Sequence, residues 1–334
     1  MMSQNELGRK VARRQLGRNG PLVPAMGFGL MMVSSHGYGA KPDNESIYAL
    51  LDRAVELGAT FWDSSDLYTG NEEALAQWFK RTGKRDQIFL ASKFGYVSGS
   101  KTLEIDSSAE YCKMACNRTL QALGIDCIDL YYAHNVDTVT PIEETMRALV
   151  ELQREGKIKH IGLSMVSSTA LRRAVKIAPV AAYQPAYSLF TRDIEGADGT
   201  NTLATCRELG IAVGSATSAP EEGDMRAKMM PQFQSGAAEK NRDIVRKLEG
   251  IAAHKGCTVA QLALAWLLKQ GDDVIPIPGT KHAKYLESNM AALQLDLSDE
   301  EEAEMRGIVD ATPVVGGVVP DAFKSFLYRD TPEA

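Results

Sequence analysis

Eight short apolar segments, each followed by a stretch with helical spacing, are the feature that most restricts how this 334-residue chain can fold. A strand-then-helix order that repeats without an obvious linker is typical of parallel α/β folds. Eight such units predict a (β/α)8 barrel, here a single domain over residues 1–334. The strands are expected at residues 25–31, 60–62, 88–92, 128–133, 158–163, 180–184, 211–214 and 273–276.

The helical segments have apolar residues three and four positions apart, which is the period of an amphipathic helix. Gly58 is placed to end the first helix, and Pro141 is placed to begin the fourth. The helices are expected at residues 44–57, 72–80, 107–123, 141–155, 168–177, 200–208, 238–255, 258–269 and 281–293.

Two additions flank the predicted barrel. Residues 14–23 are typical of a β-hairpin with a turn at Asn19 and Gly20, and such a hairpin can plug the bottom of a barrel. Residues 297–310 form an extra C-terminal helix in this interpretation, because Ser298 and Glu301 have the spacing of a capping box.

A doubly wound sheet is the alternative fold. Its dinucleotide-binding loop needs a third glycine and a downstream acidic residue, which the stretch from Gly27 to Gly29 lacks. The sequence therefore favours the barrel.

Composition narrows the class of partner. The net charge of −6 and the pI near 5.5 argue against nucleic acid or an anionic membrane as the main partner, because both require clustered positive charge. Residues 1–20 lack the apolar core of a signal peptide, and no uninterrupted apolar run is long enough to span a membrane, so a cytoplasmic location is predicted. With these partners disfavoured, a small molecule is the expected partner. No pattern in the sequence indicates the oligomeric state.

The cysteines do not indicate a metal site. There are five, with no paired spacing of the kind that zinc sites use, so no metal is predicted. Cys112 and Cys116, four residues apart on an expected helix, are the alternative, but no histidine or carboxylate cluster completes that set.

Three of the expected strands run into ionisable residues. Asp63 and Tyr68 follow the second strand, Lys93 ends the third, and His134 ends the fourth. Taken singly, each is more typical of a core or surface position than of a catalyst. In a parallel barrel the carboxyl ends of all strands meet at one mouth, where active sites lie. The set therefore predicts an active site formed by these four side chains.

These four residues resemble the catalytic tetrad of the aldo-keto reductases, NADP-dependent enzymes of the type found in fungi and plants. The resemblance extends over nearly the whole chain. It is carried in order by residues 61–73, 91–93, 129–134, 156–164, 183–189 and 275–281.

The resemblance implies an acid–base chemistry that elementary considerations support. A phenol with an ordinary pKa near 10 gives up its proton reluctantly at neutral pH. A positive Lys93 favours the phenolate of Tyr68, and Asp63 keeps that lysine in place and charged. Tyr68 is thus expected to be the proton donor, and His134 is expected to align the substrate carbonyl through a hydrogen bond.

The resemblance also implies NADP as cofactor, extended across the barrel mouth. Ser164 and Gln184 are expected at the carboxamide, Lys281 at the 2′-phosphate and Asn289 near the adenine, with Met31 as a further cofactor residue. Relatives differ at three of the neighbouring positions, occupied here by Met165, His282 and Ser288.

One segment departs further from the family pattern. After the seventh strand, relatives carry a tyrosine that stacks on the nicotinamide, followed by a long loop over the pyrophosphate. Here Ala216 occupies the stacking position, and residues 214–224 form a shortened, acidic segment. Negative charge beside a bound phosphate is unfavourable, so weakened cofactor binding is expected.

The leading prediction is an enzyme that uses NADP(H) to reduce a small aldehyde or ketone to an alcohol. One alternative is a non-redox isomerase, dehydratase or cyclase that uses Tyr68, Lys93 and His134 for acid–base chemistry on the same scaffold. Another is a regulatory subunit that senses the cofactor, since some members of the superfamily act as partners of larger proteins. The sequence does not specify the carbonyl substrate.

Overall fold

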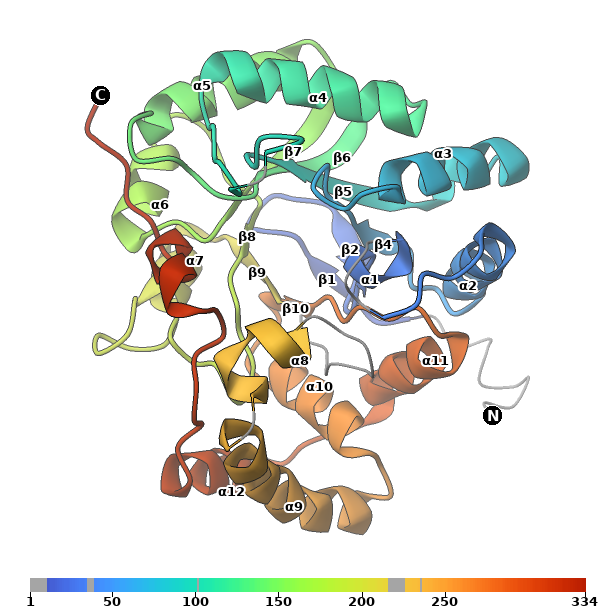
Figure 1. The fold of residues 1–334 in the computed structure, drawn as a ribbon, viewed down its shortest axis with the longest axis vertical. Helices are drawn as coiled ribbons and strands as arrows, with labels where there is room; N and C mark the ends of the chain where they lie inside the picture. Colours follow the sequence, from blue (N-terminus) through green and yellow to red (C-terminus); the bar gives the residue numbers. More distant parts are fainter. Residues whose placement is uncertain (1–10, 35–38, 101, 216–225, 235) are drawn as a thin grey trace.

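The chain forms a closed barrel of parallel strands in the computed structural model, which describes residues 11–34, 39–100, 102–215, 226–234 and 236–334. Eight strands follow one another around the sheet in the order β10-β9-β8-β7-β6-β5-β4-β3, and every neighbouring pair is parallel (Figure 1). They are β3 (Phe28–Gly29), β4 (Phe61–Asp63), β5 (Phe89–Phe94), β6 (Ile128–Ala133), β7 (Ile158–Ser164), β8 (Ala182–Gln184), β9 (Ala212–Ser215) and β10 (Val274–Pro276).

The first and last strands close the barrel. A parallel bridge joins Gly29 to Gly279, and the Gly29 amide donates to the Pro278 carbonyl at 3.1 Å. A Cβ atom on Gly29 would lie only 2.9 Å from the carbonyl oxygen of Ile277, so this closure requires a glycine. The predicted (β/α)8 barrel is confirmed.

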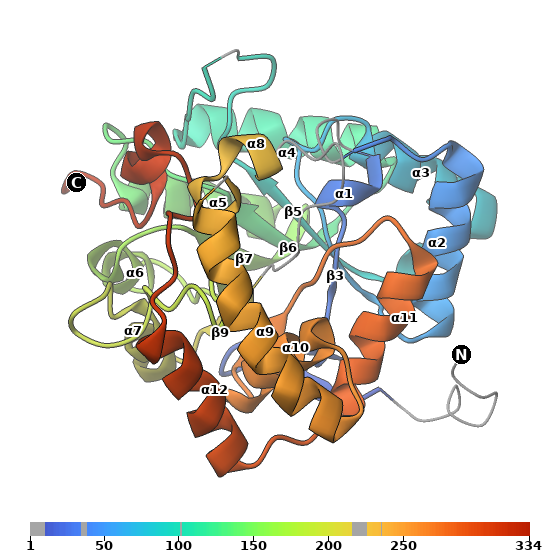
Figure 2. The same cartoon turned by 60° about the horizontal axis from the view of Figure 1, so that its bottom comes forward.

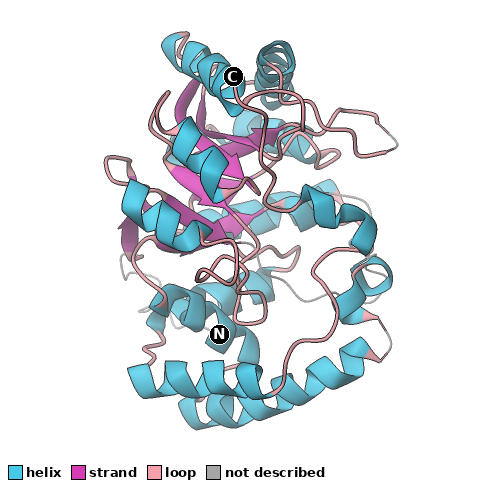
Figure 3. Cartoon of the chain, turned by 90° about the vertical axis from the view of Figure 1, so that its left-hand side faces the viewer, coloured by secondary structure: helices cyan, strands magenta, loops and turns pink. Residues whose placement is uncertain are grey.

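Helices surround the strands (Figure 3), and three of them, α9, α10 and α12, pack against one another on one side of the barrel (Figure 2). The longer helices are α2 (Asn44–Glu56), α3 (Asn71–Thr82), α4 (Ala109–Leu123), α5 (Ile142–Arg154), α6 (Ser168–Ala174), α7 (Thr202–Leu209), α9 (Ala237–Lys255), α10 (Val259–Lys269), α11 (Ala283–Ala291) and α12 (Asp299–Ala311). Two short helices, α1 (Met31–Ser34) and α8 (Arg226–Met229), follow β3 and precede α9.

Helix ends follow the local sequence signals closely. Ser298 and Glu301 form the predicted capping box of α12, so the extra C-terminal helix is confirmed. Gly58 adopts a φ of 74° directly after the last residues of α2, as predicted for a helix stop. Pro141 was expected inside its helix, but it is the N-cap residue of α5 with an extended ψ of 138°.

The N-terminal hairpin plugs the barrel, although its turn differs from the prediction. β1 (Arg13–Gln15) pairs antiparallel with β2 (Leu22–Pro24), and residues 16–21 connect them. The turn spans residues 17–20, where the Gly20 amide donates to the Gly17 carbonyl at 3.4 Å, so its two central residues are Arg18 and Asn19, one position before the predicted Asn19-Gly20 pair. Gly17 has a left-handed φ of 75°. Leu16 and Val23 are buried among barrel-interior side chains from several strands, which include Phe61, Leu130, Tyr132 and Ile275.

The start of the barrel also differs from the prediction. Residues 25–31 were expected to form one strand, but only Phe28–Gly29 are in the sheet, and the helical turn α1 begins at Met31. Glycines on both sides of Phe28 shorten the apolar run that a strand needs.

No single helix in the described part of the chain is long and apolar enough to cross a membrane; α9 and α10 meet that criterion only jointly, with a bend of 85° between them.

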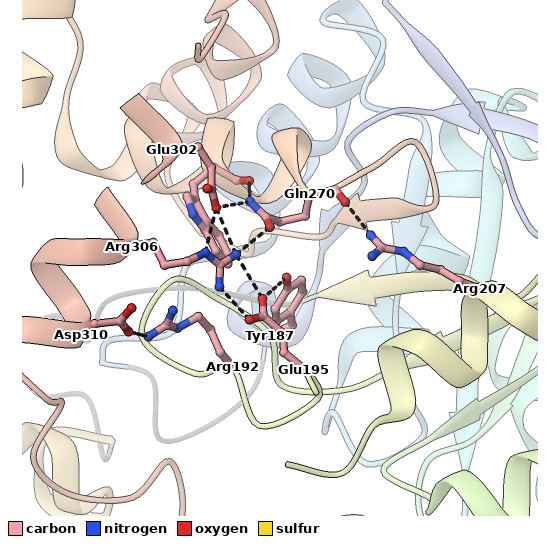
Figure 4. Close-up of polar contacts among 9 residues, drawn as sticks. Tyr187, Arg192, Glu195, Arg207, Gln270, Glu302, Arg306 and Asp310 are labelled. Carbon is pink, nitrogen blue, oxygen red and sulfur yellow. Dashed lines mark hydrogen bonds and ion pairs between the residues drawn. The ribbon is translucent and has the colours of Figure 1, made fainter. Parts of the chain in front are cut away.

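A network of charged residues fastens α12 to the loop that follows β8 (Figure 4). The Arg306 guanidinium donates to Glu195 at 2.7 Å and to Glu302 at 3.0 Å, and it lies 5.2 Å from the centre of the Trp266 ring. The Tyr187 hydroxyl donates to the same Glu195 at 2.7 Å. Because Tyr187 lies three residues beyond the end of β8, the C-terminal helix is connected to the mouth of the barrel.

Gly162 in β7 offers a test of barrel packing. A Cβ atom there would lie 2.3 Å from the Tyr132 ring, which fills the barrel interior from β6. We expect Gly162→Ala to lower the free energy of unfolding by about 1–3 kcal/mol, measured by urea denaturation, because overpacking forces the ring from its position. Gly250→Ala is the control: it lies on the exposed side of α9 with nothing within 4 Å, and it should raise that free energy by about 0.5–1 kcal/mol. Equal stability of the two variants would contradict the packing argument.

Candidate active site

The carboxyl ends of β4, β5 and β6 bring the four predicted tetrad residues together. Asp63 is the last residue of β4, Lys93 is the penultimate residue of β5, and His134 follows β6 directly. Tyr68 is held in the turn after β4, where its amide donates to the Ser65 carbonyl at 3.0 Å and its carbonyl accepts from the amide of Asn71 at 2.9 Å. Parallel pairing of three neighbouring strands therefore gathers residues that are up to 71 positions apart in the sequence.

Lys93 and Asp63 form a buried ion pair at the centre of this group. The Lys93 side chain is 0% exposed and that of Asp63 is 6% exposed. The Lys93 ammonium donates to Asp63 Oδ1, and also to the Ser64 carbonyl at 2.8 Å. Burial lowers the pKa of Lys93, and the carboxylates of Asp63 and Asp66 oppose that shift. The expected contact between Asp63 and Lys93 is thus present.

Tyr68 lies beside the ammonium and remains partly exposed to solvent. Lys93 Nζ is 5.2 Å from the centre of the Tyr68 ring. The ring is also 6.1 Å from the His134 ring, at an interplanar angle of 87°. The hydroxyl of a partly exposed tyrosine can reach a bound molecule, while the nearby buried ammonium group favours its phenolate form.

His134 is held by two residues that the sequence analysis did not single out. Its Nδ1 lies 3.1 Å from Ser65 Oγ, and the Tyr96 ring meets it edge-on at 5.1 Å. Ser65 Oγ also accepts from the Leu67 amide at 3.2 Å. In the tautomer in which the hydroxyl donates to Nδ1, the ring proton is on Nε2, on the far side of the ring from Ser65.

The charge state of His134 follows from its surroundings. Burial and the nearby positive charge of Lys93 hold the pKa of His134 well below its ordinary value. The ring is therefore neutral at neutral pH, and it is suited to donate a hydrogen bond and not to act as a strong acid.

Two of the predicted cofactor residues adjoin the ion pair. Ser164 ends β7 and Gln184 ends β8, and the two are paired in the strand register. Ser164 Oγ donates to the Gln184 carbonyl at 2.8 Å, and Gln184 Nε2 donates to Asp63 Oδ2 at 2.9 Å. A side-chain amide has both a donor and an acceptor, which is the complement of a carboxamide. This pair of side chains therefore fits the nicotinamide end of NADP.

Met31 and Lys281 follow the first and last strands, near the point where the barrel closes. Each comes two residues after the bridge between Gly29 and Gly279, and Lys281 Nζ donates to the Ala40 carbonyl at 3.3 Å. Asn289 is partly exposed in α11, the helix that follows Lys281. Met31 adjoins the ion pair, because the amide of the preceding residue, Leu30, donates to the Asp63 carbonyl at 2.9 Å.

The predicted shortened segment lies mostly outside the described residues. Gly214 and Ser215 end β9, and residues 216–225 are not described.

The cysteines of α4 are unsuited to hold a metal. Both are buried, and burial raises the pKa of Cys112 well above its ordinary value and that of Cys116 to about 12. Metal binding requires the thiolate. Within the described ranges, no group of three or more histidine, cysteine or acidic residues is arranged to hold a metal ion.

Comparisons with known proteins point to one family. The model of the Aldo/keto reductase family matches residues 25–310. The chain is 42% identical to aldo-keto reductase yakc of Schizosaccharomyces pombe, whose name specifies NADP(+), and 40% identical to aldo-keto reductase str7 of Strobilurus tenacellus; each alignment covers 96% of this chain and 98% of the relative. Among solved structures, a thermostable aldo-keto reductase in complex with the inhibitor epalrestat superposes with a TM-score of 0.71 at 26% identity, covering 89% of this chain and 100% of the other.

The buried ion pair makes a prediction about stability. Lys93→Met leaves the Asp63 carboxylate buried without its cation, and we expect the free energy of unfolding to fall by about 3–5 kcal/mol. Adding Asp63→Asn removes the uncompensated charge while it keeps an acceptor for Gln184, so the double variant should recover part of the loss. Urea denaturation of the wild type, Lys93→Met and the double variant measures both effects. A double variant that is less stable than Lys93→Met would show that the uncompensated charge is not the cause.

Proposed function

Because this chain belongs to the aldo/keto reductase family, we propose that it uses NADP(H) to reduce an aldehyde or ketone to an alcohol by reversible hydride transfer at the site described above. The observation that carries the proposal is the buried Lys93–Asp63 pair, with Tyr68 and His134 beside it at the carboxyl ends of three adjacent strands.

Tyr68 is the proton donor in this proposal. Reduction of a carbonyl places negative charge on its oxygen, and a positioned acid must supply a proton there. The Lys93 ammonium, 5.2 Å from the ring centre, stabilises the phenolate that remains after the proton leaves. Asp63 holds the ammonium charged in a site that burial would otherwise make unfavourable for it.

His134 positions the carbonyl. A neutral imidazole with its proton on Nε2 donates one directional hydrogen bond, and Ser65 and Tyr96 fix the ring that carries it. Donation to the carbonyl oxygen aligns the substrate and stabilises the charge that develops there.

Ser164, Gln184, Lys281, Asn289 and Met31 are the residues that we propose for the cofactor. NADP(H), when bound, supplies the hydride. Gln184 and Ser164 present an amide and a hydroxyl to the carboxamide, and Lys281 provides a positive charge for the 2′-phosphate. Asn289 and Met31 contribute to the same cofactor site from α11 and from the start of α1.

The alternatives of the sequence analysis have less support. The non-redox enzyme was motivated by residues 214–224, most of which are outside the described ranges. Family membership and the relatives' names favour the reductase over both that enzyme and a regulatory subunit. The cytoplasmic location, the single-domain organisation and the absence of a nucleic-acid partner stay predictions of the sequence.

Cofactor titration and one substitution test the proposal. Quenching of protein fluorescence should report NADPH binding, and NADPH should then be oxidised in the presence of simple aldehydes or ketones. Tyr68→Phe removes only the hydroxyl, so we expect turnover to fall by roughly a factor of 100 to 10,000 while NADPH affinity changes little. Full activity in that variant would exclude Tyr68 as the acid, and a lack of NADPH and NADH binding at millimolar concentration would refute the reductase itself.

The 2′-phosphate contact separates the two cofactors. Lys281→Met removes a charge that NADPH can use and NADH cannot, so the affinity for NADPH should fall about 10- to 100-fold while that for NADH is unchanged. Lys80→Met, at an exposed position near the end of α3, is the matched control and should leave both affinities intact. Fluorescence titration of each variant with both cofactors measures the difference. Equal losses for NADPH and NADH would place Lys281 away from the 2′-phosphate.

A further inference from the structure

A second tyrosine lies inside the barrel, next to the buried ion pair. Tyr132 of β6 is the register partner of Lys93 on β5, and it belongs to the same interior cluster as Ala91, which shares a face of β5 with Lys93. Lys93 Nζ lies 6.0 Å from the centre of the Tyr132 ring, compared with 5.2 Å for the Tyr68 ring. The ammonium group therefore has two tyrosines beside it, of which Tyr132 is the fully buried one.

The Tyr132 ring reaches from β6 over the neighbouring strand β7. A Cβ atom on Gly162 of β7 would lie 2.3 Å from this ring, so the glycine leaves the space that the ring occupies. Gly162 is the register partner of Ala182 on β8, two residues before Gln184. The ring is thus placed between Lys93 on one side and the strand that carries Gln184 on the other.

The Tyr132 hydroxyl is buried and has no hydrogen-bond partner in the part of the chain that the structure describes. Such groups are rare in native proteins, because burying a donor without an acceptor is unfavourable. Two polar groups nevertheless act on it. Burial raises the pKa of Tyr132 well above its ordinary value, the negative charge of Asp63 raises it further, and the Gln184 amide lowers it. The hydroxyl is therefore close to Asp63 and Gln184 without being bonded to either.

Asp63 divides its two carboxylate oxygens between different donors. Oδ1 accepts from Lys93, and Oδ2 accepts from Gln184 Nε2 at 2.9 Å. The Asp63 side chain is 6% exposed, so an oxygen that lost its donor would stay buried without one. Gln184 is also one of the residues that we propose for the nicotinamide carboxamide. One side chain is therefore needed in two places, and the Tyr132 hydroxyl is a spare donor close to both.

We propose that Tyr132 is a positioning residue whose hydroxyl replaces Gln184 at Asp63 Oδ2, which frees the Gln184 amide to turn toward the carboxamide of the cofactor. This inference rests on the reductase function proposed above. The exchange satisfies every group: the hydroxyl gains the acceptor that it lacks, Asp63 keeps two donors, and Gln184 exchanges one partner for another. The three side chains meet inside the barrel, so changes of side-chain torsions are sufficient for the exchange.

Cofactor binding to Tyr132→Phe tests this role. The variant keeps the ring and removes only the hydroxyl, so binding of the carboxamide would leave Asp63 Oδ2 without a donor. We expect the affinities for NADPH and NADH to fall about tenfold in fluorescence titration, while the affinity for 2′,5′-ADP, which lacks the nicotinamide, is unchanged. Unchanged affinity for NADPH, or an equal loss for 2′,5′-ADP, overturns the proposal.

Tyr131→Phe is the matched control. Tyr131 precedes Tyr132 in β6, it is also 0% exposed, and its hydroxyl is likewise buried with no partner among the described residues. Its ring lies on the opposite face of the strand, where it stacks on the Phe94 ring at 5.3 Å. Removing this hydroxyl should leave the affinities for all three ligands unchanged. A loss equal to that of Tyr132→Phe would show that the effect does not depend on the position beside Asp63, and it overturns the proposal.

A pair of substitutions tests the exchange without any cofactor. Gln184→Met preserves most of the side-chain volume and removes the donor, so only Tyr132 is left to satisfy Asp63 Oδ2. The folding equilibrium constant of the double variant Gln184→Met with Tyr132→Phe should be about tenfold lower than the two single effects combined would give, as measured by urea denaturation. Gln184→Met with Tyr131→Phe should instead be additive. Additive effects in both double variants overturn the proposal.

The two measurements also separate this inference from the proposed function. Additive effects in a protein that binds NADPH and reduces carbonyl compounds overturn the role of Tyr132 alone. A wild-type protein that binds neither NADPH nor NADH overturns the reductase proposal, and the positioning role with it.

Discussion

The buried contact between Lys93 and Asp63 is the interaction on which the rest of the site depends. An ammonium group removed from water is costly, and the cost is offset only if the partners are placed well. Asp63, the Ser64 carbonyl and the more distant Asp66 supply those partners from one turn, directly after β4. The position of Tyr68 follows from the same turn, so the geometry that stabilises the cation also places the phenol beside it. Gln184 binds the other oxygen of Asp63, and the ion pair is thereby linked to the cofactor side of the barrel.

The barrel, and the meeting of the four predicted residues at its mouth, could be predicted because both depend on local signals. Short apolar runs and period-3.6 patterns identify the strands and helices, and Asp63, Lys93 and His134 lie where three of those strands end. The position of the hairpin turn and the short first strand were not predicted correctly, because they do not depend on local sequence alone. Gly17 takes the left-handed position because the hairpin must fit against the barrel, where a Cβ atom on Gly17 would lie 2.7 Å from the Ala181 carbonyl oxygen. That constraint comes from residues more than 160 positions away and has no local signature.

The residues that contact the tetrad could not be predicted from the sequence for the same reason. Ser65 lies in the turn after β4, yet nothing in the neighbouring sequence shows that its hydroxyl contacts His134, which follows β6. Tyr96 is an ordinary residue of a loop until the fold sets it against an imidazole. Charge states are still less accessible, because the neutral form of His134 depends on burial and on the distance to Lys93. Sequence therefore points to the groups that we propose to react, while the surroundings that set their charge states require the folded structure.

Segments from the C-terminal end of the chain contact the ends of β7, β8 and β9, where the proposed cofactor residues Ser164 and Gln184 lie. Arg306 of α12 fixes Glu195, which accepts from Tyr187, and the Tyr187 carbonyl accepts in turn from Ser215 at the end of β9. The final residues act on the neighbouring strands, since the Arg329 amide donates to the Met165 carbonyl and Asn135 donates to the Phe326 carbonyl at 2.9 Å. Asn135 is adjacent to His134, and Met165 directly follows Ser164, so the tail contacts the segments next to both residues. The barrel strands alone place Asp63, Lys93 and His134. The loops after β7 and β8 make further contacts with α12 and the C-terminal tail, which are not part of the eight-fold repeat.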